Sequence, residues 1–326
     1  MAKILKIDDA LASALALLQA GEIVAIPTET VYGLAGDATK GEAVARIFEA
    51  KGRPRFNPLI AHVAGMAMAR RIAIFDPLSA RLAEAFWPGP LTLVLPLAPG
   101  AEVHPLVTAG LDTIALRMPQ GFGATLIGRL GHPLAAPSAN SSGRITATTA
   151  EAVEADLGDR IPLIVDGGPT PVGLESTIVK VDGPVLRLLR PGGIAAEVIE
   201  AVARCTLVRE PGAGVEAPGM LASHYAPSAA VRVGATDIRP GEALLAFGAV
   251  QPEMAEAAVA VRNLSPAGDL REAASNLFSY MKELDRSGAT TIAVAPIPDR
   301  GLGEAINDRL NRAAAPREVA ASHQAS

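Results

Sequence analysis

The chain has 326 residues, 49% of them hydrophobic and 19% charged, so its apolar content suffices for a folded core and its length suggests two domains. The formal net charge of −5 argues against the broad basic surface of a duplex-binding protein, and the single cysteine, Cys205, excludes a disulfide framework or a multi-cysteine metal site. With no signal-peptide pattern and no run of about 18 apolar residues, the sequence predicts a cytoplasmic protein without membrane contact.

Helical and strand-like segments alternate over the first two hundred residues. Apolar residues three and four apart between Ala10 and Leu18 predict a helix that Gly21 ends, and Thr148 and Glu151 have the spacing of a capping box before another helix. The predicted helices are 10–18, 43–51, 79–86, 150–157 and 194–203, and the predicted strands are 22–26, 58–63, 91–95, 113–117, 162–165, 176–181 and 185–189. This alternation predicts an α/β domain over residues 1–205 around one sheet, whose strand order the pattern does not reveal.

Glycine, proline and polar residues then replace the alternation, which predicts a linker over residues 206–229. Beyond it, the predicted strands are 243–247, 259–261 and 291–295, and the predicted helices are 273–284 and 304–314. These elements predict a small Rossmann-like α/β domain over residues 230–316. The tail, residues 317–326, has no packing pattern and is predicted to be disordered.

Two polar segments follow predicted strands. Hydroxyl groups in segment 27–34 are placed to line a ligand crevice, although a capped turn explains them equally well. Segment 135–144 is rich in small residues, and its Ser138 and Asn140 suit phosphate or ribose oxygens, although it is not a P-loop. His62 lies within a predicted strand and by itself indicates a buried core histidine rather than a ligand-binding residue. None of the histidines has metal-site spacing, and no serine lies in a GxSxG elbow.

Cationic side chains stand at three places in this net-acidic chain. Lys51, Arg53 and Arg55 share a short segment that glycine and two prolines stiffen, which suits a polyphosphate, although on its own a solvated charge run explains it somewhat better. Arg117 and Arg190 end predicted strands, where a guanidinium group fits a carboxylate or phosphate; an internal ion pair fits both equally well.

Seven motifs, in this order, resemble those of the YrdC family: PTETVYGL, KGRPRFNPL, WPGPLT, TAGLDTIALRMP, APSAN, DGGPTPVGLESTI and LRPG. The linker sequence APGMLASHYAP resembles that of the long, two-domain members. The resemblance implies a YrdC-like twisted open sheet with flanking helices. It also implies a nucleotidyltransferase that converts L-threonine, bicarbonate and ATP into threonylcarbamoyl-adenylate and pyrophosphate, the first step of tRNA N6-threonylcarbamoyladenosine formation at position 37.

The resemblance further assigns site residues. Those implied for ATP, of which Lys51 and Arg53 are implied to be catalytic, are Lys51, Arg53, Arg55, Asn57, Thr113, Ser138, Asn140, Thr146 and Arg190. Those implied for L-threonine are Thr28, His62, Arg117, Ala136 and Ser176, with Arg117 pairing with the substrate carboxylate. Mg²⁺ is expected to accompany ATP, with no structural metal and no evident general base. The expected partner is a tRNA threonylcarbamoyl-transferase complex that takes the product, and tRNA itself is expected to bind weakly at most.

One departure concerns the linker. Some long members carry Lys-Tyr-Arg before His-Tyr, whereas this chain has Leu221-Ala222-Ser223, so Ser223 replaces a cation and closure over the site would rely on His224 and Tyr225. The second domain and the linker are hypothesised to gate nucleotide entry. The alternative function is a non-catalytic RNA-binding or translation-associated module, which the acidic balance disfavours. A carbamoyl transferase of hydrogenase maturation is excluded because such proteins carry zinc-binding cysteine pairs.

Overall fold

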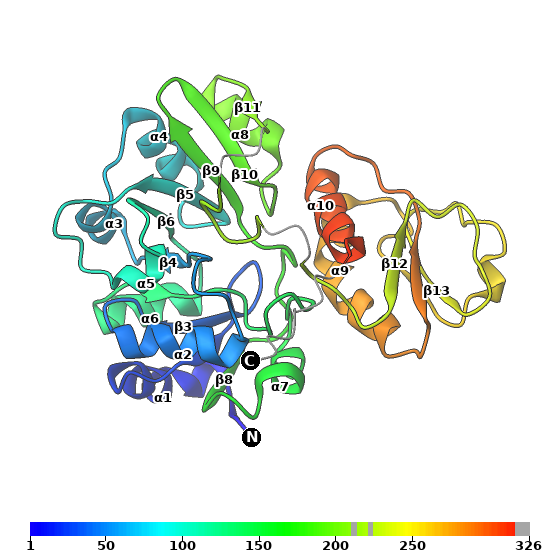
Figure 1. Cartoon of the computed structure of the whole chain (residues 1–326), viewed down its shortest axis with the longest axis horizontal. Coiled ribbons are helices and arrows are strands. Elements are labelled where there is room, and N and C mark those ends of the chain that lie inside the picture. Colours follow the sequence, from blue (N-terminus) through cyan, green and yellow to red (C-terminus); the bar gives the residue numbers. More distant parts are fainter. Residues whose placement is uncertain (210–213, 221–223, 317–326) are drawn as a thin grey trace, which may run out of the picture.

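The two α/β domains lie side by side in the computed structural model, which describes residues 1–209, 214–220 and 224–316 (Figure 1). Helices of the second domain separate its small sheet from the first domain. Ser223 and the tail 317–326, which the sequence analysis singled out, lie outside the described residues. None of the helices in the described ranges is both long and apolar enough to cross a membrane.

Strands of the described part of the first domain form one mixed eleven-stranded sheet. In sheet order they are β1 (Lys3–Lys6), β8 (Leu163–Asp166), β2 (Val24–Ile26), β3 (Gly33–Asp37), β7 (Leu134–Ala135), β4 (Ile60–His62), β6 (Thr113–Arg117), β5 (Leu91–Pro96), β9 (Thr177–Asp182), β10 (Val185–Arg190) and β11 (Leu207–Val208). Each strand predicted from the sequence in this region is present. β11 extends the sheet to Val208, inside the segment for which the sequence predicts a linker.

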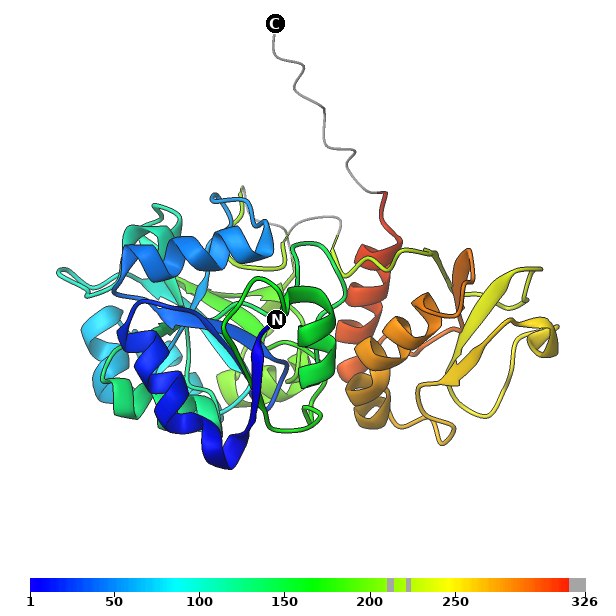
Figure 2. The same ribbon diagram turned by 90° about the horizontal axis from the view of Figure 1, so that it is seen from below.

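Helices flank this sheet, as Figure 2 shows from below. They are α1 (Ile7–Gln19), α2 (Gly41–Lys51), α3 (Met66–Ile72), α4 (Pro77–Phe86), α5 (Pro105–Thr108), α6 (Phe122–Leu130), α7 (Ala150–Leu157) and α8 (Ala196–Ala203). The predicted helices are all present, and Gly52, in the left-handed conformation at φ 59°, ends α2 as expected. Helices α3, α5 and α6 were not predicted from the sequence.

The predicted capping box at the start of α7 is wrong by one residue. The N-cap is Thr149, whose hydroxyl accepts the backbone N–H of Ala152 at 3.2 Å. The hydroxyl of Thr148 instead lies 2.9 Å from that of Ser279 in the second domain. Thr148, which the sequence pattern assigned to the cap of α7, therefore forms a contact between the domains instead.

The second domain contains a parallel four-stranded sheet in the described residues, as expected of a Rossmann-like unit. Its strands in sheet order are β12 (Ala230–Val233), β15 (Thr291–Val294), β13 (Glu242–Ala246) and β14 (Val261–Asn263), and its helices are α9 (Leu270–Asp285), α10 (Leu302–Ala314) and the short 3₁₀ helix η1 (Ala255–Ala257). The strand predicted at 259–261 begins instead at Val261, and β12 was not predicted. Helices α9 and α10 lie between this sheet and the first domain (Figure 1).

An apolar cluster joins the domains. Val31, Leu174 and Tyr225 pack in the same cluster as Leu277 and Phe278 of α9. The backbones also approach closely, since a Cβ added at Gly173 would lie 2.4 Å from the carbonyl oxygen of Ala274. The interface is thus a packed core rather than a loose contact.

The linker packs on part of one face of the large sheet. Ile60 of β4, Ala115 of β6 and Ile178 of β9 point to the same face of the sheet, where they pack with Ala217 and Met220 of the linker. The opposite face packs against helices in the main core. The linker therefore lies against the same sheet face as the side chains described next.

Candidate active site

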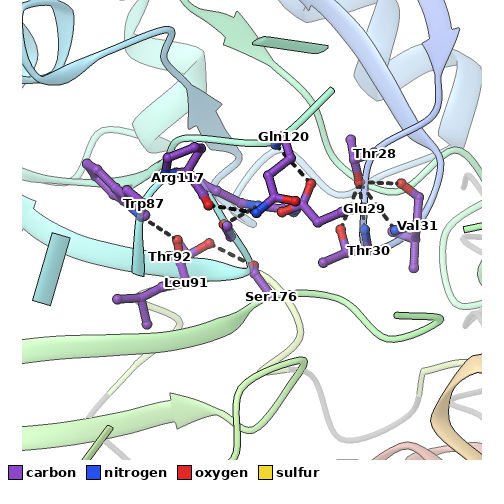
Figure 3. Close-up of polar contacts among 12 residues, drawn as sticks. Thr28, Glu29, Thr30, Val31, Trp87, Leu91, Thr92, Arg117, Gln120 and Ser176 are labelled. Atoms are coloured by element: carbon purple, nitrogen blue, oxygen red, sulfur yellow. Dashed lines mark hydrogen bonds and ion pairs between the residues drawn. The ribbon is translucent and has the colours of Figure 1, made fainter. Parts of the chain in front are cut away.

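Four polar side chains meet at the ends of β4, β5, β6 and β9. In the strand register, His62 lies opposite Arg117, and Arg117 lies opposite Thr92 on its other side. Thr92 is paired with Ile178, and the alternation of side chains points Ser176 to the same face. The hydroxyl groups of Thr92 and Ser176 lie 2.7 Å apart (Figure 3). The sheet thus joins residues that are more than a hundred positions apart.

Arg117 forms a buried ion pair with Glu29, which lies in the loop after β2 (Figure 3). Arg117 Nη2 lies 2.6 Å from Glu29 Oε1, and the two side chains are 5% and 9% exposed. Glu29 Oε2 accepts the backbone N–H of Gln120 at 3.1 Å, and Arg117 Nε donates to the carbonyl of Gly89 at 3.3 Å. The internal ion pair that the sequence analysis left open for Arg117 is therefore present.

Lys51 is buried at the end of α2. Its Nζ donates to the backbone carbonyl of Ser138 at 2.5 Å and to that of Asn140. Burial and the positive charge of Arg53 lower the pKa of Lys51 to about 7. Since Lys51 ends α2 and its amine reaches the 138–140 loop, it ties two of the predicted polar segments together.

Arg53 is buried beside Lys51, whereas Arg55 is exposed. Arg53 Nη2 donates to the carbonyl of Pro58 at 2.8 Å, and its Nε donates to that of Asn57 at 3.3 Å. Burial lowers the pKa of Arg53 to about 10, which leaves it charged at neutral pH. The interpretation of this segment as a solvated charge run is wrong, because two of its three cations are removed from water.

Glu175 links the 138–146 loop to the second domain. Its Oε1 accepts from the hydroxyl of Thr146 at 2.7 Å, and its Oε2 accepts from Arg309 Nε of α10 at 3.0 Å. Burial opposes its ionisation, but the guanidinium groups of Arg309 and Arg190 lower the pKa of Glu175 to about 2. The carboxylate is therefore ionised throughout the physiological range.

Arg190 joins the strand ends to the linker. Its Nη2 donates to the carbonyl and hydroxyl oxygens of Ser176 at 2.8 and 3.1 Å, and its Nη1 donates to the carbonyl of Pro218 at 3.4 Å. In the described residues no carboxylate forms an ion pair with Arg190, so the internal ion pair considered for it is not found there. Gly219, at φ +84°, brings the linker backbone close against the Arg190 side chain.

His224 and Tyr225 complete the wall from the linker side. Their ring centroids are 4.1 Å apart, and the ring of Tyr225 also stacks on Phe278 of α9. Burial lowers the pKa of His224 to about 3, so this imidazole is neutral at physiological pH. These two linker residues therefore line the cavity from the side opposite the strand ends.

These side chains enclose a small cavity of about 50 Å³. It is lined by Val31, Arg53, Ile60, His62, Arg117, Ala136, Pro137, Ser138, Glu175, Ser176, Arg190, Pro218, Gly219, His224 and Tyr225. Five further candidate residues lie one hydrogen bond behind this lining: Thr28, Lys51, Asn57, Asn140 and Thr146. The remaining two candidates neither line the cavity nor lie directly behind it: Arg55 is exposed, and Thr113 lies at the opposite end of β6 from Arg117.

Unsatisfied polar atoms gather around the cavity. Among the described residues, six buried side-chain nitrogen or oxygen atoms have no hydrogen-bond partner, and four of these belong to Asn57, His62, Asn140 and His224. Buried polar groups are nearly always paired, so such a cluster indicates groups kept for a ligand. His62 is neutral as well, because burial and Arg117 lower its pKa to about 3.

Two family models match the chain. The model described as "Telomere recombination" matches residues 16–192, and "Threonylcarbamoyl-AMP synthase, C-terminal domain" matches residues 194–315. The threonylcarbamoyl-AMP synthase of Bacillus subtilis is 40% identical over 96% of this chain and 95% of its own length. That of Pyrococcus abyssi is 41% identical over 93% of each. The chain belongs to the threonylcarbamoyl-AMP synthase family. The alternative of a non-catalytic RNA-binding module is therefore wrong.

The solved structure of the P. abyssi family member, Sua5 complexed with L-threonine, has the same fold. It superposes with a TM-score of 0.84 at 38% identity, covering 93% of this chain and 94% of that one. This likeness extends across both domains, so the resemblance to the long, two-domain members of the synthase family is confirmed. The twisted sheet with a second α/β domain is confirmed with it.

Two acidic residues of the candidate site in this chain, Glu29 and Glu175, were not predicted from the sequence. Each is the only carboxylate in its motif, PTET or LEST, and lies among small or hydroxyl residues after an apolar stretch. An isolated carboxylate in such surroundings needs a cationic partner when buried, and that requirement is the signal that was available. The partners, Arg117 and Arg309, lie 88 and 134 positions away.

Proposed function

We propose that the chain joins L-threonine, bicarbonate and ATP into threonylcarbamoyl-AMP and pyrophosphate. The observation that supports this most is the placement of Arg117 and of Arg53 and Arg190 around one cavity, with Lys51 directly behind it. Arg117 suits a carboxylate, and the other cations suit a polyphosphate. The groups for both substrates therefore face one another across the same cavity, as a reaction between the two substrates requires.

The reaction needs little from the protein besides placement and charge. The threonine amine captures CO₂ or bicarbonate as a carbamate, and a carbamate oxygen then attacks the α-phosphorus of ATP while pyrophosphate leaves. Lys51, Arg53 and Arg190 would bind the triphosphate and stabilise charge on the departing pyrophosphate. Ser138 and Asn140 would hold the nucleotide, as the family resemblance implies.

Threonine would lie against the strand ends. Arg117 would bind its carboxylate, while Ser176, Thr28 and the backbone at Ala136 would contact the rest of the amino acid. His62 is neutral, so its ring can hydrogen-bond to the substrate without adding a second cation beside Arg117. That neutrality favours a carboxylate site over a second phosphate site.

We expect Mg²⁺ to reach the site as part of MgATP. In the described ranges no group of three or more His, Cys, Asp or Glu side chains is arranged to hold an ion, so the triphosphate oxygens are the natural ligands. Mg²⁺ would neutralise charge on the phosphates. The protein's own part is to place the cations of Lys51 and Arg53 around them.

ATP requires more room than this cavity provides. Sites for drug-sized ligands have volumes of about 300–1,000 Å³, whereas this cavity has about 50 Å³. The wall formed by Gly219, His224 and Tyr225 would have to withdraw from Arg190 for nucleotide to enter. This supports the hypothesis that the linker and the second domain gate the site.

The product would be a reactive mixed anhydride of a carbamic and a phosphoric acid. It is expected to pass to a tRNA threonylcarbamoyl-transferase complex in the cytoplasm, with tRNA itself binding this chain weakly at most. The net charge of −5 agrees with a product hand-off between proteins rather than a tight tRNA complex.

A product assay tests the proposal. Pyrophosphate release should require threonine and bicarbonate together, and mass spectrometry should detect threonylcarbamoyl-AMP; release at the same rate without threonine would exclude the assignment. Lys51→Ala and Arg53→Ala should each lower turnover by orders of magnitude, whereas Arg117→Ala should mainly raise the KM for threonine. The family resemblance implies that Arg55 binds ATP, whereas its exposed position predicts that Arg55→Ala changes turnover by less than about twofold. Measuring turnover of this variant decides between the two.

A further inference from the structure

The guanidinium group of Arg309 lies inside the interface between the domains. It is fully buried on α10, with 0% of its side chain exposed. Its Nε donates to Glu175 at 3.0 Å, its Nη1 to Asp308 at 2.5 Å and its Nη2 to the carbonyl of Pro191 at 2.9 Å. Its Cζ lies over the ring of Tyr225, 5.1 Å from the ring centroid. These contacts fix the group in one orientation.

Glu175 connects this arginine to the cavity. One carboxylate oxygen accepts from Arg309, the other accepts from Thr146, and the residue lines the cavity next to Ser176. An anion at this position opposes a triphosphate unless a cation compensates it. Among the described residues, Arg309 is the cation that lies within hydrogen-bond distance of Glu175.

We propose that Arg309 is a positioning residue of the nucleotide site: by pairing with Glu175 it holds Thr146 and keeps the cavity cationic enough to accept ATP. This rests on the proposed function, because it assumes that the cavity binds the triphosphate. The second domain then contributes to the active site through one side chain, as well as through the linker that precedes it.

A purely structural ion pair would hold the domains together without affecting nucleotide binding. The two roles differ in what happens when Arg309 is removed. If the pair only joins the domains, Arg309→Met leaves analogue binding by the folded protein unchanged. If Arg309 neutralises the cavity, neutralising Glu175 restores ATP binding even though the contact between the domains is lost.

The test uses full-length variants Arg309→Met, Glu175→Gln and the double variant. We measure the KM for each substrate by pyrophosphate release, and the Kd for a non-hydrolysable ATP analogue by calorimetry. Arg309→Met should weaken analogue binding about tenfold or more at pH 8 and change the KM for threonine less than about threefold, and the double variant should recover to within about threefold of wild type. Glu175→Gln alone should tighten analogue binding, because it leaves the cavity more positive.

The pH profile separates the two roles further. The charged or titratable groups that act on Glu175 are Arg309 of α10, Arg190 of β10, Lys51 of α2, and His224 and Tyr225 of the linker. Asp308 pairs with Arg309 from the other side, and Arg53, His62 and Arg117 line the same cavity as Glu175. Without Arg309 the carboxyl group should protonate at a higher pH, so analogue binding by Arg309→Met should improve between pH 8 and pH 6. The double variant lacks this carboxyl group and should not show the added improvement.

Arg209→Met is the matched control. Arg209 Nε lies 2.7 Å from Glu304 Oε1, so it also joins the domains through α10, but it does not line the cavity. Its loss should leave analogue binding unchanged. A double variant that binds the analogue no better than folded Arg309→Met would overturn the proposal, as would weaker binding by Glu175→Gln. Wild-type protein that binds the analogue but makes no threonylcarbamoyl-AMP would contradict the proposed function instead.

Discussion

Glu29 and Arg117 share a buried ion pair, with 2.6 Å between Glu29 Oε1 and Arg117 Nη2, at the place where the proposed function puts the threonine carboxylate. Two carboxylates would then share one guanidinium group. Arg117 has further N–H donors beyond the two that bond to Glu29 and Gly89, so both carboxylates can be accommodated. The internal carboxylate nevertheless reduces the positive potential that threonine meets.

Glu29→Gln should therefore lower the KM for threonine by about threefold to tenfold, since it keeps the side-chain shape and removes the competing charge. Steady-state pyrophosphate release with varied threonine measures it. Glu22→Gln is the control, because Glu22 pairs with Arg46 at the surface, far from the cavity lining. A higher KM in a variant that melts at the wild-type temperature would mean that Glu29 acts mainly by orienting Arg117.

Lys51 gives ATP binding a proton linkage. Burial lowers its pKa to about 7, so at pH 8 the amine is largely neutral before nucleotide binds. A triphosphate beside it favours the ammonium form, and binding should take up close to one proton at pH 8–9 and almost none at pH 6. Calorimetry in buffers of different ionisation enthalpy measures this uptake. Lys51→Met should abolish it; uptake that persists in this variant would assign the proton to another group.

The same pKa predicts how stability depends on pH. The folded value of about 7 lies below the ordinary value of 10.5, so between these two pH values the unfolded chain binds more protons. The contribution of Lys51 to the free energy of unfolding should therefore increase as the pH rises from about 7 to 10.5. Urea unfolding of wild type and Lys51→Met at pH 7, 8 and 9 should show the difference between the two proteins changing in this direction. A constant difference would contradict it.

Sequence patterns correctly predicted the helix ends and strands that depend on neighbouring residues in the chain. Gly52 ends α2 where the left-handed conformation is needed, and β6 has the predicted limits 113–117. The order of the strands in the sheet, in contrast, could not be predicted from the sequence. Strand β7, for example, has only two residues and pairs antiparallel with both β3 and β4. The sequence indicates a short apolar strand before residue 135, but the pairing of so short a strand is set by its neighbours in the fold.

The partners in the buried ion pairs could not be predicted from the sequence either. Arg117 fitted a substrate or an internal carboxylate equally well, and only the fold showed that Glu29 faces it. Glu175 was passed over because its partner, Arg309, lies in the other domain. The family motifs nevertheless selected residues that the fold brings around one cavity, except for Arg55 and Thr113.

The start of α7 shows how a tertiary contact overrides a local pattern, and it gives a stability prediction. Thr149→Ala removes the N-cap bond to the Ala152 N–H and should cost about 1 kcal/mol in the free energy of unfolding. Thr148→Ala removes only the hydroxyl contact with Ser279 and should leave α7 itself unaffected. Urea unfolding compares the two, and amide exchange of residues 150–153 should increase in Thr149→Ala alone. Faster exchange of these amides in Thr148→Ala would show that Thr148 also caps α7, as the sequence pattern predicted.

Gly219 allows a direct test of how the linker seats over the cavity. It adopts φ +84°, and a Cβ there would lie 2.7 Å from Arg190 Cδ and 3.5 Å from the hydroxyl of Tyr225. Gly219→Ala is therefore strained both by its backbone and by contact, and it should cost about 1 kcal/mol or more. The linker should respond by moving off Arg190, because the arginine is held by Ser176.

Gly214→Ala is the matched control in the same linker, since a Cβ there would have no atom within 4 Å. Hydrogen exchange of residues 214–220 should become faster in Gly219→Ala and remain as in wild type in Gly214→Ala. Turnover should fall in Gly219→Ala alone, because the wall that excludes water from the reacting carbamate closes less often. If exchange rises and turnover does not change, the linker seats over Arg190 but its closure is not needed for the reaction.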